Sequence, residues 1–187
     1  MNDFSLATPT VVAYFCASPG GRAELFQEET RDDTNQRIIG IAIHEGMDVY
    51  KHLLIATDGS EVAQKAVDQG FDLAKALNAK TTVIYVTPRW SDTFGEDVSA
   101  YDKIDAEEAA KILSSVRDVA KKAAITCDTL HVKDRFPAEG IIETANARGC
   151  DLIVMASHGR RGLRRLILGS QANEVVMRST IPVLVCR

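Results

Sequence analysis

Long apolar runs, cysteine pairs and an excess of basic charge are all missing from this sequence, and each absence excludes a class of protein. No apolar run approaches the roughly 20 residues that span a bilayer, so a membrane protein is not expected. The net charge is −4, which argues against broad binding to nucleic acid or to an acidic membrane surface. The cysteines lie far apart, which argues against a disulfide framework and favours reduced thiols in the cytoplasm; they are Cys16, Cys127, Cys150 and Cys186.

Several familiar catalytic patterns are missing as well. The Gly-rich stretch between residues 156 and 170 lacks the Gly-Lys-Ser/Thr ending of a Walker loop, and it does not match G-x-G-x-x-G. No Ser–His–Asp arrangement is evident by spacing. His44, His52 and His131 are scattered and indicate no metal site. No residue stands out as a general base or as a group that positions an attacking water.

The chain divides near Met47. With 187 residues and 45% hydrophobic residues, we expect one domain with an appendage. Residues 1–46 show no regular alternation, although Val11–Ala17 and Ile38–Ile43 are candidate strands. Two interpretations of this segment stay open: a weakly structured extension, or a mis-assigned start in which translation begins at Met47. Residues 47–187 form the predicted domain.

After Met47, apolar runs of β type alternate with helical patterns. The predicted strands are Leu53–Ala56, Thr81–Val86, Thr129–Val132, Leu152–Ala156 and Ile181–Cys186. The predicted helices are Ser60–Leu77, one capped by Asp105, one from Pro137 to a stop at Gly149, and Ser170–Arg178. Strands alternating with helices predict an α/β fold with a doubly wound parallel sheet.

Three details sharpen this prediction. The first helix is expected to bury one face, made of Val62, Ala66, Leu73 and Leu77. Leu152–Ala156 does not alternate between apolar and polar residues, so we expect both of its faces to be covered. Pro182 cannot donate to a ladder, which predicts an edge position for the last strand.

The loop between Ala156 and Ser170 is the strongest functional signal. It follows a buried strand, contains several glycines and arginines, and ends in Gly169-Ser170 where a helix begins. Free N–H groups and the positive end of a helix dipole favour an anion at such a place. The candidate anion-binding residues are Ser157, Gly159, Gly162, Gly169 and Ser170.

The arginines and the histidine of this loop have two interpretations each. Arg160, Arg161, Arg164 and Arg165 suit a clamp on a polyphosphate or, equally, a solvated basic turn. His158 belongs to the residue type that can serve as a switch at physiological pH, or it serves only to position the loop.

Asp58 is the second candidate. It follows the first strand and precedes Gly59-Ser60, where the first helix opens. Ligands of parallel sheets lie beyond the carboxyl ends of strands, so this carboxylate could accept from a ribose hydroxyl or an adenine amine, or hold Mg²⁺. The alternative is a turn that only caps the helix.

Four segments together resemble the universal stress proteins. They are Ile55–Ser60, Asp151–Arg160, Leu168–Ser170 and Ile181–Val185, and the resemblance covers Val49–Arg187. The resemblance implies a Rossmann-like sheet of five parallel strands, related to that of the adenine-nucleotide alpha hydrolases, in the order 3-2-1-4-5. Its switch point, between the first and fourth strands, brings the Asp58 turn beside the Ser157–Gly162 loop.

The resemblance also implies an ATP site, with or without Mg²⁺. Family members bind ATP through Gly-x-x-Gly, nine residues and Gly-Ser/Thr. Here Gly159, the nine residues from Arg160 to Leu168, and Gly169-Ser170 match, whereas Ala156 replaces the first glycine. Asp58 carries over as the acidic residue, Val86 as the backbone contact to adenine, and Gln171 as a backbone N–H facing phosphate.

A homodimer is implied through the last strand, with Ile181, Val183, Leu184 and Val185 at the interface. The expected function is that of a cytoplasmic ATP-binding sensor in the stress response, acting on protein partners that the sequence does not identify. Two alternatives stay open: a slow ATPase or other adenylate-handling hydrolase, and a nucleotide-free dimeric interaction protein. Ala156 is the main support for the second alternative.

Overall fold

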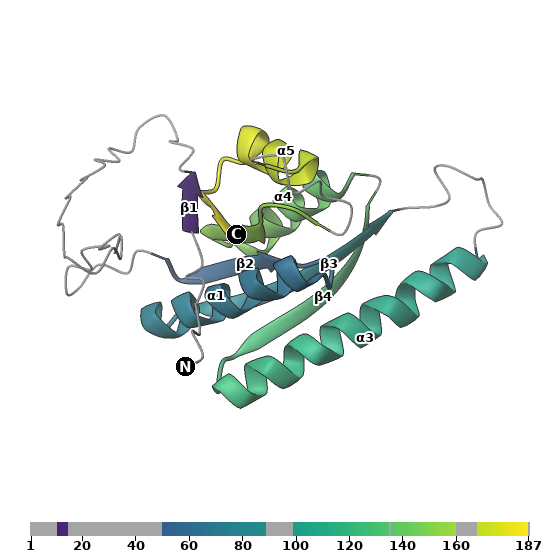
Figure 1. Cartoon of the computed structure of the whole chain (residues 1–187), viewed down its shortest axis with the longest axis horizontal. Coiled ribbons are helices and arrows are strands. Elements are labelled where there is room, and N and C mark those ends of the chain that lie inside the picture. Colours follow the sequence, from purple (N-terminus) through teal and green to yellow (C-terminus); the bar gives the residue numbers. More distant parts are fainter. Residues whose placement is uncertain (1–10, 15–49, 89–98, 135, 160–167, 187) are drawn as a thin grey trace, which may run out of the picture.

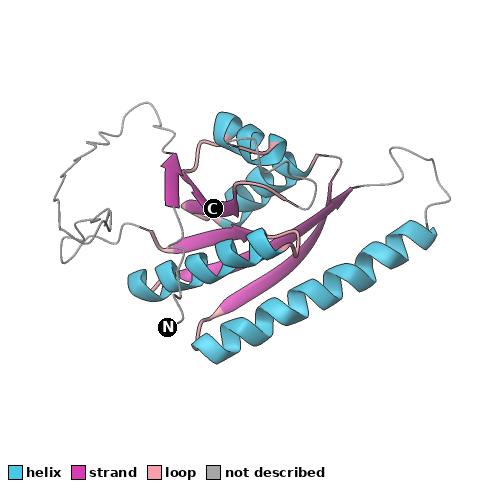
Figure 2. Ribbon diagram, in the orientation of Figure 1, coloured by secondary structure: helices cyan, strands magenta, loops and turns pink. Residues whose placement is uncertain are grey.

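The computed structural model describes residues 11–14, 50–88, 99–134, 136–159 and 168–186. Helices and strands alternate through most of these ranges (Figures 1 and 2). The strands are β1 (Val11–Tyr14), β2 (His52–Ala56), β3 (Lys80–Pro88), β4 (Cys127–Asp134), β5 (Leu152–Ala156) and β6 (Val183–Cys186). The helices are α1 (Glu61–Leu77), α3 (Ser99–Ala123), α4 (Pro137–Arg148) and α5 (Ser170–Arg178).

The sheet confirms the predicted topology and adds one strand. Its order is β1-β6-β5-β2-β3-β4, and every pair from β4 through to β6 is parallel. Counted from β2, this is the predicted order 3-2-1-4-5. The winding reverses between β2 and β5, so the loops that follow these two strands lie side by side. The added strand, β1, pairs antiparallel with β6.

Each face of the sheet packs against its own pair of helices. On one face, Leu53, Ile55 and Val154 pack against α1 and α3. On the other face, Leu54, Ile153 and neighbouring side chains pack against α4 and α5. All five residues of β5 are buried, as the absence of alternation predicted. Among the described helices, none is long and apolar enough to cross a membrane.

Helix α1 lies unusually close to the sheet, and this corrects its predicted face. The buried residues are Ala63, Ala66, Val67, Gly70, Phe71 and Ala74, whereas Val62, Leu73 and Leu77 are only half-buried. A Cβ at Gly70 would lie 2.7 Å from Cδ1 of Ile55. At position 70 a larger side chain would therefore hold the helix away from β2.

Helix α3 begins at Ser99, six positions before the predicted cap at Asp105. No glycine or proline interrupts the residues between these positions, and Asp105 lies inside the helix. An ion pair between Asp102 and Lys133 of β4, with 3.0 Å between Oδ1 and Nζ, ties the first turns to the sheet. Every fourth or third apolar residue of the sequence, at 109, 112, 113, 116 and 120, predicts one buried face; Ala109, Leu113, Val116 and Ala120 are buried and Ile112 is half-buried.

The carboxylate of Asp151 joins the beginnings of the two central strands. Its Oδ2 accepts from the backbone N–H of Lys51 at 2.8 Å, and its Oδ1 accepts from that of His52 at 3.0 Å. The N–H of Asp151 in turn donates to the carbonyl O of His52 at 3.0 Å. These bonds fix the register of β2 against β5 at the end of the sheet opposite the loops.

The predicted edge position of the last strand is wrong. β6 begins at Val183, so Pro182 lies just before the first residue that pairs with a neighbouring strand. The missing N–H of Pro182 therefore removes no hydrogen bond between strands. Its carbonyl O still accepts from the N–H of Ile153 at 2.9 Å. β1 covers the other side of β6, within the predicted candidate strand Val11–Ala17. Residues 38–43, the other candidate, lie outside the described residues.

The described cysteines, Cys127, Cys150 and Cys186, are all free thiols, in agreement with the prediction. Burial raises the pKa of Cys150 and of Cys186 to about 11 in each case. For Cys150 the nearby charge of Asp151 raises the pKa further. Cys127 is half-buried, and burial raises its pKa as well.

The Gly70–Ile55 contact gives a test of the close packing of α1. We expect Gly70→Ala to lower the free energy of unfolding, because overpacking costs about 1–3 kcal/mol. This exceeds the gain in helix propensity of up to about 1 kcal/mol. The loss should shrink in an Ile55→Val background, which removes the Cδ1 atom nearest to the new methyl group. Urea unfolding of the four proteins measures the coupling, and equal losses in both backgrounds would contradict the packing argument.

Candidate functional site

The turn from β2 into α1 is built around Asp58. Gly59 has a φ of 75°, a conformation that favours glycine. The N–H of Ser60 donates to Oδ1 of Asp58 at 3.0 Å, and Oγ of Ser60 accepts from the N–H of Ala63 at 3.2 Å. The N–H of Thr57 donates to the carbonyl O of Ile84 at 3.0 Å, which fastens the turn to β3. Asp58 therefore shapes the turn that caps α1, and this role is compatible with holding a ligand.

The chain leaves β5 through Ser157, which is buried and bonded on two sides. Its N–H donates to the carbonyl O of Cys186 in β6 at 2.7 Å, and its carbonyl O accepts from the N–H of Gly169 at 2.8 Å. Both ends of the loop between Gly159 and Leu168 are thus anchored at one place. Ala156 ends a regular strand and is absent from the described residues with positive φ.

The two loops meet at Asp58 and Gly159. A Cβ at Gly159 would lie 2.6 Å from Oδ2 of Asp58, closer than real Cβ contacts allow. A side chain at position 159 would therefore require the carboxylate of Asp58 to move. The predicted meeting of the Asp58 turn with the loop after β5 is present in the structure.

The beginning of α5 is the third part of the site. Gly169 is the N-cap and provides no capping side chain, and the first helical bond runs from the N–H of Asn173 to the carbonyl O of Gly169 at 2.9 Å. The N–H groups of Ser170, Gln171 and Ala172 have no acceptor inside the helix, as at any helix start. A Cβ at Gly169 would lie 3.1 Å from the carbonyl O of Ser157, so a small residue keeps α5 close to the loop.

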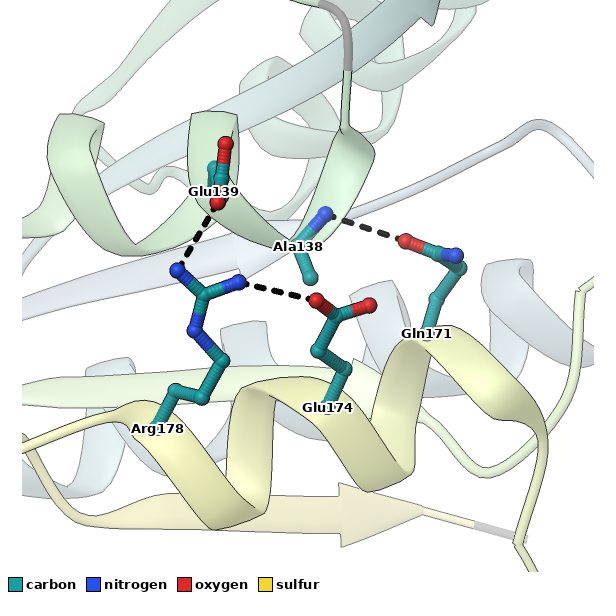
Figure 3. A network of polar contacts seen from close by, with 5 residues as sticks. All are labelled: Ala138, Glu139, Gln171, Glu174 and Arg178. Atoms are coloured by element: carbon teal, nitrogen blue, oxygen red, sulfur yellow. Dashed lines mark hydrogen bonds and ion pairs between the residues drawn. The ribbon is translucent and has the colours of Figure 1, made fainter.

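The side chain of Gln171 has a role that the sequence did not reveal. Its Oε1 accepts from the N–H of Ala138 at 3.0 Å and so caps α4, whose own N-cap, Phe136, provides no side-chain bond (Figure 3). Further along α5, Arg178 bridges Glu139 of α4 and Glu174, each at 2.8 Å (Figure 3). The first turn of α5 is therefore coupled to the first turn of α4.

His158 is held by its neighbour. Its Nδ1 is hydrogen-bonded to Oγ of Ser157 at 3.0 Å. Its Nε2 is buried and has no hydrogen-bond partner among the described residues. The bond to Ser157 fixes the orientation of the His158 ring beside Gly159.

The remaining predicted residues divide into two sets. Arg160 and Gly162, together with Arg161, Arg164 and Arg165, lie outside the described residues. Val86 is half-buried in β3, two residues beyond the carbonyl O of Ile84 that holds the Asp58 turn. It therefore lies near the carboxyl end of β3, on the strand next to β2.

A cavity of about 340 Å³ adjoins the Asp58 turn on the side of α1 and α3. Its lining residues are Thr57, Gly59, Gln64, Glu108, Lys111, Ile112 and Ser115. The sequence predicted Glu108 as a capping residue and Ile112 as part of an apolar stripe, but it did not predict that four residues of α3 line a cavity. Their spacing at positions i, i+3, i+4 and i+7 marks one helical face, and this was the available signal.

A polar cluster on β3 and β4 lies behind this cavity. Oη of Tyr85 donates to Glu108 Oε2 at 3.3 Å, and Thr87 Oγ1 is hydrogen-bonded to Nε2 of His131 at 2.8 Å. Burial lowers the pKa of His131, and the charge of Lys133 lowers it further. In the described part of the chain, no group of three His, Cys, Asp or Glu side chains is arranged to hold a metal.

The Asp58–Gly159 contact can be tested by a double-mutant cycle. Gly159→Ala should lower the free energy of unfolding, because its methyl group collides with Oδ2 of Asp58. The loss should be smaller in an Asp58→Ala background, with a coupling of about 0.5–3 kcal/mol between the two sites. Asp68→Ala, at an exposed position of α1, is the matched control background and should show no coupling. Additivity in both backgrounds would disprove the contact.

The capping role of Gln171 gives a second test. Gln171→Ala should cost about 1 kcal/mol of stability, because it leaves the N–H of Ala138 without its acceptor. Gln171→Glu keeps an acceptor oxygen and should stay close to the unmodified protein in urea unfolding. Asn173→Ala, also exposed on α5, controls for the loss of an amide side chain. An equal loss in the Ala and Glu variants would argue against capping.

Comparisons with known proteins agree with this geometry. Universal stress protein MJ0531 of Methanocaldococcus jannaschii is 32% identical over 161 residues, covering 80% of this chain and 89% of the relative. Universal stress protein YxiE of Bacillus subtilis is 29% identical, covering 74% and 100%. A solved universal stress protein in complex with cAMP is 29% identical, with a TM-score of 0.60 and coverage of 73% and 96%.

The family model described as "Universal stress protein family" matches residues 49–187, which include β2 to β6 and all the site residues named above. The sheet order, the Asp58 turn and the loop into α5 lie within this range. The chain therefore belongs to the universal stress protein family.

Proposed function

We propose that this chain is an ATP-binding regulatory module of the cytoplasm, which signals nucleotide occupancy to protein partners in a stress response. The observation that carries the proposal is the meeting of Asp58, Gly159 and the beginning of α5 at the carboxyl ends of β2 and β5. A carboxylate and a row of backbone N–H groups thereby face one region. The carboxylate suits a hydrogen-bond donor of ribose or adenine, and the N–H groups suit a phosphate.

The described residues fit such a ligand. Gly159, without a side chain, lets the carboxylate of Asp58 lie against the backbone of the loop that leads to α5. Ala156, the departure from the family motif, lies at the end of a regular strand with no positive φ. A glycine is thus not demanded there by backbone conformation, and the methyl group of Ala156 is compatible with a bound nucleotide.

The adenine part of the proposal is supported by the solved relative in complex with cAMP, which is 29% identical to this chain. The phosphate part rests on the first turn of α5 and on the sequence spacing from Gly159 to Gly169-Ser170. Val86 at the end of β3 is the proposed backbone contact to adenine. Arg160 and Gly162, which follow Gly159 in sequence, are proposed to complete the phosphate loop.

Mg²⁺ would arrive with the nucleotide. It binds mainly through phosphate oxygens, with one or two protein carboxylates at most. Asp58 is the proposed protein ligand, through water or directly.

Titration with ATP in a calorimeter tests the proposal. We expect binding with Mg²⁺ present, without turnover above a protein-free control. Asp58→Asn keeps the acceptor for the N–H of Ser60 but replaces the second carboxylate oxygen, so binding should weaken by about 10–100-fold. Asp72→Asn, exposed on α1, is the matched control and should bind as the unmodified chain does.

Two results would overturn parts of the proposal. Absence of ATP binding in the unmodified chain, with binding gained in Ala156→Gly, would show that Ala156 makes this protein nucleotide-free. Turnover that is lost in Asp58→Asn would indicate a hydrolase rather than a sensor. A homodimer through β6 completes the proposed function, and it requires that β1 leave the outer edge of β6.

A further inference from the structure

The outer side of β6 is occupied by a strand of the same chain. β1 runs antiparallel to β6, with Val12 opposite Val185 and Tyr14 opposite Val183 (Figures 1 and 2). Residues 15–182 separate the two strands in sequence, so this pairing joins distant parts of the chain. The five-stranded parallel sheet thus gains an antiparallel sixth strand at the position where a partner would bind.

The hydrogen bonds of β6 show which of its backbone groups face β1. The carbonyl O atoms of Pro182 and Cys186 accept from Ile153 and Ser157, at 2.9 and 2.7 Å, and therefore point toward β5. The N–H and C=O of successive residues point to alternate sides of a strand. The groups of Val183 and Val185 therefore point toward β1, opposite Tyr14 and Val12.

β1 and β6 are similar strands. Both contain four residues, VVAY and VLVC, and neither contains a charge, a proline or a glycine. An uncharged apolar strand with outward N–H and C=O groups is a template for pairing when it is left bare. The β6 strand of a second copy, related by a two-fold axis, would also pair antiparallel with β6 and would also be apolar, as β1 is.

We propose that β1 and a second copy of this chain compete for the same edge of β6, and that β1 keeps the full chain monomeric. This inference rests on the proposed homodimer. A strand tethered in the same chain acts at an effective concentration in the millimolar range when its linker permits contact. A second copy at lower concentration therefore pairs through β6 only after β1 has left.

Proline substitutions in β1 test the competition in the full chain. Val12→Pro removes an N–H that faces β6, so β1 should leave and the mass in sedimentation equilibrium should double to two chains. Ala13→Pro is the matched control, because the N–H of Ala13 points away from β6; it should retain the mass of one chain. A two-chain mass for the unmodified protein, or a one-chain mass for Val12→Pro, overturns the inference.

A disulfide provides a second measurement that does not depend on proline. Ala13 and Leu184 are directly opposite, in a pair that does not exchange hydrogen bonds, where Cα atoms lie about 4.5 Å apart. Ala13→Cys with Leu184→Cys, in a Cys16→Ser background, should form a bond within one chain under oxidising conditions. When Val12→Pro is added to the double-cysteine protein, the disulfide should hold β1 on β6, so dimers should form only after the disulfide is reduced. Cross-linking mainly between chains would overturn the proposed pairing within one chain.

The outcomes separate this inference from the proposed function. A dimer of the unmodified chain overturns the competition and leaves the homodimer in place. If the unmodified chain and the Val12→Pro variants all have the mass of one chain, and the disulfide forms within the chain, both the homodimer and the competition are overturned. ATP titration of the same proteins reports on nucleotide binding independently, because β1 contributes no residue to the Asp58–Gly159 site.

Discussion

The parallel pairing of β2 with β5 is the constraint on which the rest of this structure depends. Asp151 fixes the register at the start of both strands, through backbone N–H groups of Lys51 and His52. From there the chain winds in opposite directions, so that α1 and α3 cover one face and α4 and α5 the other. The same pairing sets the separation of the two loops at the far end. Asp58 can touch the backbone at Gly159 only because the two strands are neighbours and end at the same level.

This arrangement assigns two tasks to the first turn of α5. Its backbone lies at the candidate nucleotide site, whereas the side chain of Gln171 provides the acceptor that α4 lacks. Arg178 adds ion pairs to Glu139 and Glu174 at the other end of the same helix. A shift of α5 would therefore be transmitted to α4. These two helices lie on the face of the sheet opposite to α1. In the proposed sensor, a movement at the candidate site would pass through α5 to α4 on that face.

Local signals in the sequence were sufficient for strands β2 to β6 and for α5, whereas the meeting of the two loops was implied by the resemblance to the universal stress proteins. The apolar run Leu152–Ala156 and the Gly-Ser start of α5 each define their element without reference to anything distant. Features that depend on tertiary contacts were missed. The start of α3 at Ser99 is supported by an ion pair to β4, and the inner face of α1 follows from how closely it approaches Ile55. The pairing of β1 with β6 joins residues at the two ends of the chain, for which the sequence holds no local signal.

The buried thiols have a consequence for the kinds of stress that this domain can register. Peroxides attack the thiolate form, and a pKa of about 11 leaves roughly one in ten thousand thiols ionised at neutral pH. Cys150 and Cys186 are in addition almost completely enclosed. Oxidant sensing through these two residues would require β6 or the end of α4 to unfold first. The intact fold therefore protects both thiols from oxidation, and an oxidant would leave the packing around Cys150 and Cys186 unchanged.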